Sequence, residues 1–285
     1  MARLLCVAFL LLVRPAPGKA LEGELPTDVH PWQVYEFEMI AERELSSPYV
    51  DGLQEGGPGY VSVTFRGENG QAEGQQLKVT GFWDGGSRWR VRFAPPAPGD
   101  WSYRSSSSDS GLDGQTGSFR CTAWTDAERQ ANATRRGFVS VCSGGPRSGR
   151  YFEYADGTPM LWLGDTWWNW TKRGIPFERV QNLVDTRSKQ GFNVGQLFFA
   201  GRGWGRESSL LDDTFTKPDL EHIRHVERMI QYANRQGITV WIHGWWSNPD
   251  MNKSIGEEQI RRWCRYTVHR LGAYNVIWVL AGEYN

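Results

Sequence analysis

The hydrophobic period of the chain changes near residue 150, and this change constrains the fold more than any other feature of the sequence. Before it, apolar and polar residues alternate, as in Tyr35-Glu36-Phe37-Glu38-Met39 and in the segment Arg88 to Phe93. A period of two is typical of strands with one buried face. Clusters of Gly, Pro, Asp and Ser separate these segments, and no long helical pattern interrupts them. We therefore predict an immunoglobulin-like antiparallel β-sandwich over residues 21–123.

After residue 150, continuous apolar segments alternate with helical patterns. The apolar segments, which predict buried strands, are Met160–Leu163, Phe192–Ala200, Ile238–His243 and Val276–Ala281. The helical patterns run from Pro176 to Gly191, from Pro218 to Gly237 and from Ile260 to Gly272. This alternation predicts a parallel sheet covered by helices over residues 151–285. Residues 124–150, with Gly144-Gly145-Pro146 and several Arg, are expected to form a linker.

Two architectures, a doubly wound sheet and a barrel, fit this second region. A nucleotide-binding doubly wound sheet carries a Gly-rich phosphate loop after its first strand, whereas this chain has Gly164-Asp165-Thr166-Trp167-Trp168 there. The barrel is therefore favoured. A (β/α)8 TIM barrel needs eight strands and about 250 residues, so we expect only its first half, with four strands. Either the sequence is truncated, which we favour, or a half-barrel pairs with another surface through its open edge.

The N-terminus and the cysteines indicate a secreted protein. Residues 1–20 combine Arg3, an apolar segment and the small-residue site Gly18-Lys19-Ala20, as a signal peptide does. Three glycosylation sequons, at Asn132, Asn169 and Asn252, agree with that route. Once the signal is removed, Cys121, Cys142 and Cys264 remain. In an oxidising compartment a Cys121–Cys142 disulfide is expected by proximity, the alternative being three buried thiols.

Composition excludes several classes of partner. The 32 Lys and Arg balance the 32 Asp and Glu, so no summed charge attracts nucleic acid. No CxxC or HExxH motif appears, and His222 and His225 are expected to lie on a helix surface, so we expect no metal or other cofactor. No apolar segment has the roughly 20 residues that span a membrane. The oligomeric state is left open.

In a barrel of this kind the active site is built at the carboxyl ends of the strands. The residues there are mostly aromatic or polar, which suits a carbohydrate, because aromatic faces stack on sugar rings while polar groups bind hydroxyls. The 15 Trp of the chain agree with such a site, or alternatively with large cores. The candidates are Asp165, Trp167, Trp168, Phe199, Arg202, His243, Trp245, Trp246, Glu283, Tyr284 and Asn285.

Each candidate also has a purely structural interpretation. Asp165 could hydrogen-bond backbone amides, His243 could be a core histidine, and Glu283 could form a structural salt bridge. Trp167 and Trp168 are adjacent, so at least one of them is expected to pack in the core.

Several motifs resemble known families. Leu163 to Trp168 is similar to the first strand of apiosidase-like (DUF4038) barrels, and Val276 to Tyr284 resembles strand four of clan-A glycoside hydrolases. The segments Gly81 to Gly85, Trp89 to Phe93 and Gly99 to Tyr103 resemble the DUF5060 domain that often precedes such barrels. The resemblance implies a glycoside hydrolase in which Glu283 is the general acid/base and Asp165 orients the substrate. It places the nucleophile at strand seven, beyond the present sequence. On geometry alone, Asp165 could instead be the partner of Glu283.

We therefore expect a secreted, retaining glycoside hydrolase that acts on an oligo- or polysaccharide, represented by a fragment without its nucleophile. The alternative is a non-catalytic carbohydrate-binding or cell-surface interaction protein.

Overall fold

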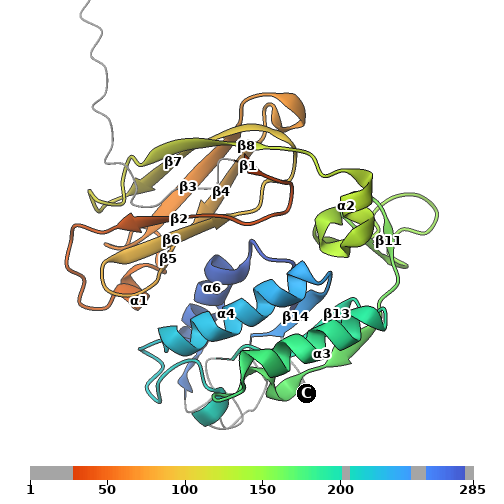
Figure 1. Cartoon of the computed structure of the whole chain (residues 1–285). Helices are drawn as coiled ribbons and strands as arrows, with labels where there is room; N and C mark the ends of the chain where they lie inside the picture. The colour runs from red at the N-terminus through yellow and green to blue at the C-terminus, as the bar shows by residue number, and fades with distance from the viewer. Residues whose placement is uncertain (1–27, 201–205, 245–254, 280–285) are drawn as a thin grey trace, which may run out of the picture.

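The computed structural model describes residues 28–200, 206–244 and 255–279 of the chain. Two sheets at the N-terminus lie against a layer of helices, and these helices cover one face of a separate, parallel sheet (Figure 1). The fold is therefore mixed and rich in sheet, and its two halves are in direct contact.

The N-terminal sheets enclose a core of alternating apolar residues. Trp89, Trp101, Phe65 and Phe37 are all almost completely buried between them. The first sheet has the order β1-β8-β7-β3-β4 and the second the order β2-β6-β5. The strands are β1 (Asp28–Val29), β2 (Tyr35–Ile40), β3 (Val61–Gly67), β4 (Gln76–Thr80), β5 (Phe82–Trp83), β6 (Arg88–Phe93), β7 (Gly99–Ser107) and β8 (Thr116–Cys121), with the short helices α1 (Pro48–Asp51) and η1 (Gly70–Ala72). We call residues 28–121 the two-sheet region.

The second region contains a parallel sheet whose strands follow one another in sequence order. The order is β12-β13-β14-β15, with bounds Gly164–Thr166, Val194–Phe198, Thr239–His243 and Val276–Val279. The expected first strand, Met160–Leu163, is wrong. Leu161 is 84% exposed, and Pro159–Met160 form β11 in another sheet. The parallel sheet begins at Gly164, which pairs with Val194, and the preceding Leu163 O accepts from the backbone amides of Asn193 and Val194.

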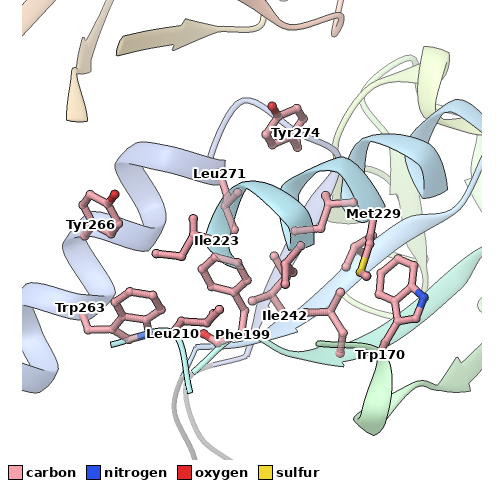
Figure 2. Packing of buried hydrophobic residues seen from close by; sticks show 14 of the residues in the cluster. Trp170, Phe199, Leu210, Ile223, Met229, Ile242, Trp263, Tyr266, Leu271 and Tyr274 are labelled. Atoms are coloured by element: carbon pink, nitrogen blue, oxygen red, sulfur yellow. Dashed lines mark hydrogen bonds between the residues drawn. The ribbon is translucent and has the colours of Figure 1, made fainter. Parts of the chain in front are cut away.

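Three amphipathic helices cover one face of the parallel sheet. They are α3 (Phe177–Lys189), α4 (Leu220–Arg235) and α6 (Glu257–Leu271), close to the expected positions. The apolar residues of α4 recur every three or four positions, as Ile223, Val226 and Ile230 do, and so bury one stripe against the sheet. Figure 2 shows this core, in which Ile223 and Met229 pack near Ile242 and Phe199. The short helices η3 (Trp168–Thr171) and η4 (Arg206–Ser208) lie in its loops.

Residues 124–150 are structured, whereas a linker was expected. They contain α2 (Asp126–Ala131), η2 (Ala133–Arg136) and β9 (Val139–Val141). Thr125 caps α2, because its hydroxyl accepts from the backbone amide of Glu128, whose carboxylate accepts in return from the amide of Thr125. Strand β9 pairs with β10 (Phe152–Tyr154), which pairs with β11.

The expected disulfide between Cys121 and Cys142 is not formed in the structure. Cys121 ends β8 and lies in the core of the two-sheet region. Cys142 follows β9, and its thiol donates to Gly144 O at 3.4 Å. Nearness in the sequence was misleading here, because Cys121 ends a strand of one sheet whereas Cys142 follows a strand of another.

A buried network of charges joins the two halves. Arg92 on β6 donates from Nη1 to Glu227 on α4 at 2.5 Å, and Arg270 on α6 donates to the same carboxylate at 2.7 and 2.8 Å. Arg270 also pairs with Asp84, which follows β5, at 2.8 Å. Burial would raise the pKa of Glu227, but the charges of Arg92 and Arg270 outweigh it and lower the pKa to about 2. The two-sheet region and the helices are therefore held in one arrangement.

Within the ranges described, no helix is both long and apolar enough to cross a membrane.

Candidate functional site

The helices α3, α4 and α6 cover one face of the parallel sheet, whereas the opposite face packs in part against β10 and β11, where Val194 shares a small core with Tyr154 and Met160. Leu197, Val240 and Ile242 point toward the helices and belong to their core. Side chains alternate along a strand, so the intervening residues point to the opposite face. We call this second side the inner face. Register brings Thr166, Gln196, Trp241 and Ile277 into one row across it and Phe198, His243 and Val279 into the next.

Gln196 and His243 form the polar centre of the inner face. The Gln196 side-chain amide and His243 Nε2 share a short hydrogen bond between neighbouring strands. Burial lowers the pKa of His243 below its ordinary value, so the imidazole is neutral at pH 7. A neutral imidazole and an amide can both donate to and accept from hydroxyl groups. Sequence analysis identified His243 but missed Gln196, which lies inside an apolar strand instead of after it.

Aromatic rings surround this polar pair. Trp168 of η3 meets the His243 ring at a centroid distance of 5.4 Å, and Trp241 meets it at 5.6 Å. Trp162 contacts Trp241 edge-on at 5.3 Å. Trp168 and Trp241 are only half-buried. The inner face thus combines flat apolar rings with uncharged hydrogen-bonding groups.

Trp167 and Phe199 were predicted to line the site, but both belong to the core. Trp167 is 4% exposed and packs beside Trp170, and its indole fills the space over Gly195, where a Cβ atom would lie 2.0 Å from the ring. Phe199 is completely buried and stacks on Trp263 of α6 at 5.6 Å. Both side chains therefore point to the helical face, whereas the adjacent Trp168 lies beside His243.

Asp165 also lies on the helical side, in register with Gly195. Its carboxylate accepts from Arg187 Nε of α3 at 2.5 Å and from Trp167 Nε1 at 3.0 Å. It also accepts from the backbone amide of Thr166 at 2.9 Å. Burial opposes ionisation, but these hydrogen bonds outweigh it and lower the pKa of Asp165. The contacts favour the structural interpretation, in which Asp165 attaches strand β12 to helix α3.

The remaining candidates lie outside the described residues. These are Arg202, Trp245, Trp246, Glu283, Tyr284 and Asn285.

The sequons differ in their surroundings. Asn132 is 8% exposed, and its Nδ2 donates to Asn234 O at 3.2 Å and to Arg235 O at 2.9 Å. Glycosylation there was expected, but the attachment atom makes these two backbone contacts, which a glycan on Asn132 would disrupt. Asn169 is exposed and stays a predicted site, and Asn252 lies outside the described ranges.

The described residues include no group of three or more His, Cys, Asp or Glu side chains placed to hold a metal ion. His222, expected on a helix surface, is buried, and its Nε2 hydrogen-bonds to Thr171 O at 2.7 Å.

Comparison with known proteins gives two family matches. Residues 146–285 match the apiosidase-like catalytic domain, and residues 28–108 match a domain of unknown function, DUF5060. No match is found among curated proteins.

The chain is also similar to solved structures of glycoside hydrolases. One, a provisionally assigned glycoside hydrolase from Bacteroides vulgatus ATCC 8482, is 22% identical with a TM-score of 0.68, and the match covers 90% of this chain and 49% of that chain. The present chain therefore spans about half the length of that structure. A family 5 glycoside hydrolase from the same organism is 22% identical over 54% of this chain and 35% of its own, with a TM-score of 0.46. The likeness of fold rests on the first of these.

Proposed function

We propose that this chain is the N-terminal part of a secreted, retaining glycoside hydrolase. The observation that carries the proposal is the match of residues 146–285 to an apiosidase-like catalytic domain, whose described strands bring Gln196 and His243 together on the inner face, with Trp168 of η3 beside His243. An aromatic and uncharged polar surface of this kind suits a sugar ring.

The proposed architecture is the first half of a clan-A (β/α)8 barrel preceded by an immunoglobulin-like sandwich. Two features support it. The strands β12 to β15 are parallel and follow sequence order without the reversal that a doubly wound sheet has at its switch point. Among the described strands, β12 and β15 are the edges of the sheet, and closing a barrel would hydrogen-bond both edges to further strands. The inner face would then line the barrel interior.

In the proposed mechanism Glu283 is the general acid/base. It follows Val279 by four residues, so an uninterrupted alternation predicts that it shares the inner face with His243 and Val279. Its carboxyl proton goes to the departing glycosidic oxygen as a nucleophilic carboxylate, contributed from beyond Asn285, bonds to the anomeric carbon. The Glu283 carboxylate then takes a proton from the water that releases the sugar. Retention requires these two carboxyl groups to lie about 5–5.5 Å apart.

The other site residues would bind and orient the sugar. Trp168 and Trp241 offer ring faces, and Gln196 and His243 offer hydrogen bonds to hydroxyls. Asp165 is not assigned as the carboxylate partner of Glu283, because Arg187 and Trp167 hold it on the helical side. Secretion is proposed on the signal-like residues 1–20.

The test is hydrolysis by a protein that joins this chain to the further strands that the proposed barrel requires. The protein is incubated with a panel of oligosaccharides, and the anomer released first is identified by proton NMR. Cleavage with retained configuration supports the proposal. Binding without cleavage of any member of the panel would favour the non-catalytic carbohydrate-binding alternative, and release of the inverted anomer would contradict the retaining mechanism.

A further inference from the structure

A cavity of about 600 Å³ lies where three parts of the chain meet, away from the inner face. Its walls come from the segment between β1 and β2, from the segment that contains α2 and η2, and from the C-terminal end of α4 with the loop before β15. Figure 1 shows α2 beside the two-sheet region and above the helical layer. We call this space the junction cavity. Its volume is in the range of small-molecule sites, which often occur between structural units.

The walls of the junction cavity are fixed to each other by hydrogen bonds. Asn132 is bonded to the last turn of α4, as described above, and Thr134 Oγ1 donates to Asn234 O at 2.9 Å. The side chain of Asn275 donates to Thr134 O at 3.2 Å, and its backbone amide donates to Asn234 Oδ1 at 3.0 Å. The cavity is therefore preformed, so a ligand would lose little affinity to reorganisation of the protein.

Trp32 stands on the wall in an unusual backbone conformation. Its φ angle is 65°, in the left-handed region that bulky residues rarely adopt, while its amide donates to Pro95 O at 2.9 Å. The side chain is half-buried and lines the cavity. Backbone strain of this kind is retained where the surrounding structure demands it and is concentrated at ligand sites. Here it presents an indole to the cavity.

The charges on the wall favour an anion. Glu36, the carboxylate on the wall, is held by Arg90 at 2.6 Å and by Arg92 at 2.5 Å. Arg135 and Arg235 also line the cavity, and among the described residues no carboxylate lies within ion-pair distance of either. Arg135 stacks on Trp124 at 4.4 Å and donates from Nη1 to Glu128 O at 3.2 Å, which fixes its guanidinium and leaves its other donors for a ligand, and Arg235 is exposed at the end of α4. A guanidinium whose donors are available binds a carboxylate strongly.

Uncharged hydrogen-bonding groups complete the wall. Gln33 is exposed, and Gln231 donates to the Tyr274 hydroxyl at 2.8 Å. Side-chain amides of this kind bind the hydroxyl groups of sugars through both their oxygen and their nitrogen.

We propose that the junction cavity binds a saccharide that carries a carboxylate, such as a hexuronic acid unit. The carboxylate pairs with Arg135 and Arg235, the ring packs against Trp32, and the amides of Gln33 and Gln231 bind hydroxyls. The choice of a saccharide rests on the proposed function. Among the described residues, none of those that line the cavity lies on the inner face, so the cavity is a second site.

The test compares two disaccharides that differ in one group. Binding of cellobiouronic acid and of cellobiose to the chain is measured by titration calorimetry in the Glu283→Gln background, where hydrolysis cannot contribute. We expect cellobiouronic acid to bind at least about tenfold more tightly, because a hydrogen bond to a charged group is worth about 1.5–3 kcal/mol. Arg235→Gln and Arg135→Gln should each remove most of this preference. Arg228→Gln, on the same helix but outside this cavity, is the matched control and should leave it unchanged.

Three outcomes would overturn the proposal: equal affinity for the two disaccharides, no binding of cellobiouronic acid at millimolar concentration, or an equal loss in Arg228→Gln and Arg235→Gln. None of these bears on hydrolysis at Glu283, which is measured separately. Each Arg variant is accompanied by its melting curve, because a loss of affinity counts only where the fold is retained.

Discussion

Arg92 Nη1 and Glu227 Oε1 lie 2.5 Å apart across the contact between the two-sheet region and helix α4, and both side chains are 3% exposed. Arg92 also donates to the backbone carbonyl of Arg270 at 2.6 Å. Residues of the two-sheet region and residues of the helices thus belong to one buried cluster of charges. Because an uncompensated charge is expensive to bury, the two halves are stabilised in this arrangement as a unit.

Glu227→Gln should therefore lower stability sharply. The change keeps the shape of the side chain but leaves Arg92 and Arg270 without their common carboxylate, and breaking a buried pair typically costs about 3–5 kcal/mol. Urea denaturation should show the loss across both halves of the chain. The matched control is Glu221→Gln on the exposed side of the same helix, which should change stability by less than about 0.5 kcal/mol. Equal small effects from both variants would mean that the cluster does not join the halves.

This cluster could not be predicted from the hydrophobic pattern of the sequence. The alternation in β6 correctly separates Trp89, Val91 and Phe93 from Arg88, Arg90 and Arg92, but alternation identifies only the two faces of a strand. It does not say what covers the polar face. Here α4 and α6 cover it, and Arg92 is buried against Glu227, a carboxylate far along the chain, as well as against Glu36 of β2.

The site was predictable only in part, because a hydrophobic pattern locates a strand but does not say which face of the sheet the residues at its end will join. The sequence placed His243 at the end of a predicted strand, and the structure puts it at the end of β14. Trp168 was selected for following a first strand that begins later in the structure than expected, but its ring does lie beside His243. Which of two adjacent aromatics faces inward depends on register. Register assigns Trp167 and Phe199 to the core and leaves Gln196, inside a strand, on the inner face.

Trp167 and Trp168 should respond to substitution in opposite ways. Trp167→Ala should lower stability by about 3–5 kcal/mol, because it leaves a cavity in the core over Gly195. Trp168→Ala should leave the melting temperature nearly unchanged and weaken oligosaccharide binding roughly two- to tenfold, since aromatic stacking is worth about 0.5–1.5 kcal/mol. Calorimetric binding and thermal melting of both variants check this. If Trp168→Ala destabilises the chain as strongly as Trp167→Ala, Trp168 is a core residue.

Acidification should destabilise the protein in two stages. Burial, with a smaller effect of Arg265, lowers the pKa of His269 from 6.5 to about 4. As the pH falls, His269 therefore takes up a proton in the unfolded chain at a higher pH than in the folded chain. The stability that depends on neutral His269 is complete above pH 6.5 and is lost as the pH falls to about 4. The lowered pKa of Glu227 adds a second loss between its ordinary value of 4.5 and about 2.

Stability measured from pH 7.5 to 4 in His269→Gln should therefore depend less on pH than in the unchanged chain. An identical pH dependence in the two proteins would exclude His269 as the source of the first stage.

Glycosylation should distinguish the two described sequons. In protein secreted from eukaryotic cells, peptide mass spectrometry should find a glycan on Asn169, which is exposed, and none on Asn132. Asn132 uses its Nδ2 to bond the end of α4, and folding around a glycan there would break both contacts. High glycan occupancy at Asn132 would contradict the observed packing of η2 against α4.

The central claim, that Glu283 is the acid/base of a glycoside hydrolase, is tested most directly by Glu283→Gln in a protein with the complete proposed barrel. Hydrolysis of a substrate with a poor leaving group should fall about 10²–10⁴-fold, because Gln cannot donate the proton that the departing oxygen needs. A substrate with an activated aryl leaving group should lose far less in its first step, and azide should restore turnover by replacing the activated water. Equal losses for both substrates, together with a clear drop in melting temperature, would instead make Glu283 a structural residue and contradict the account.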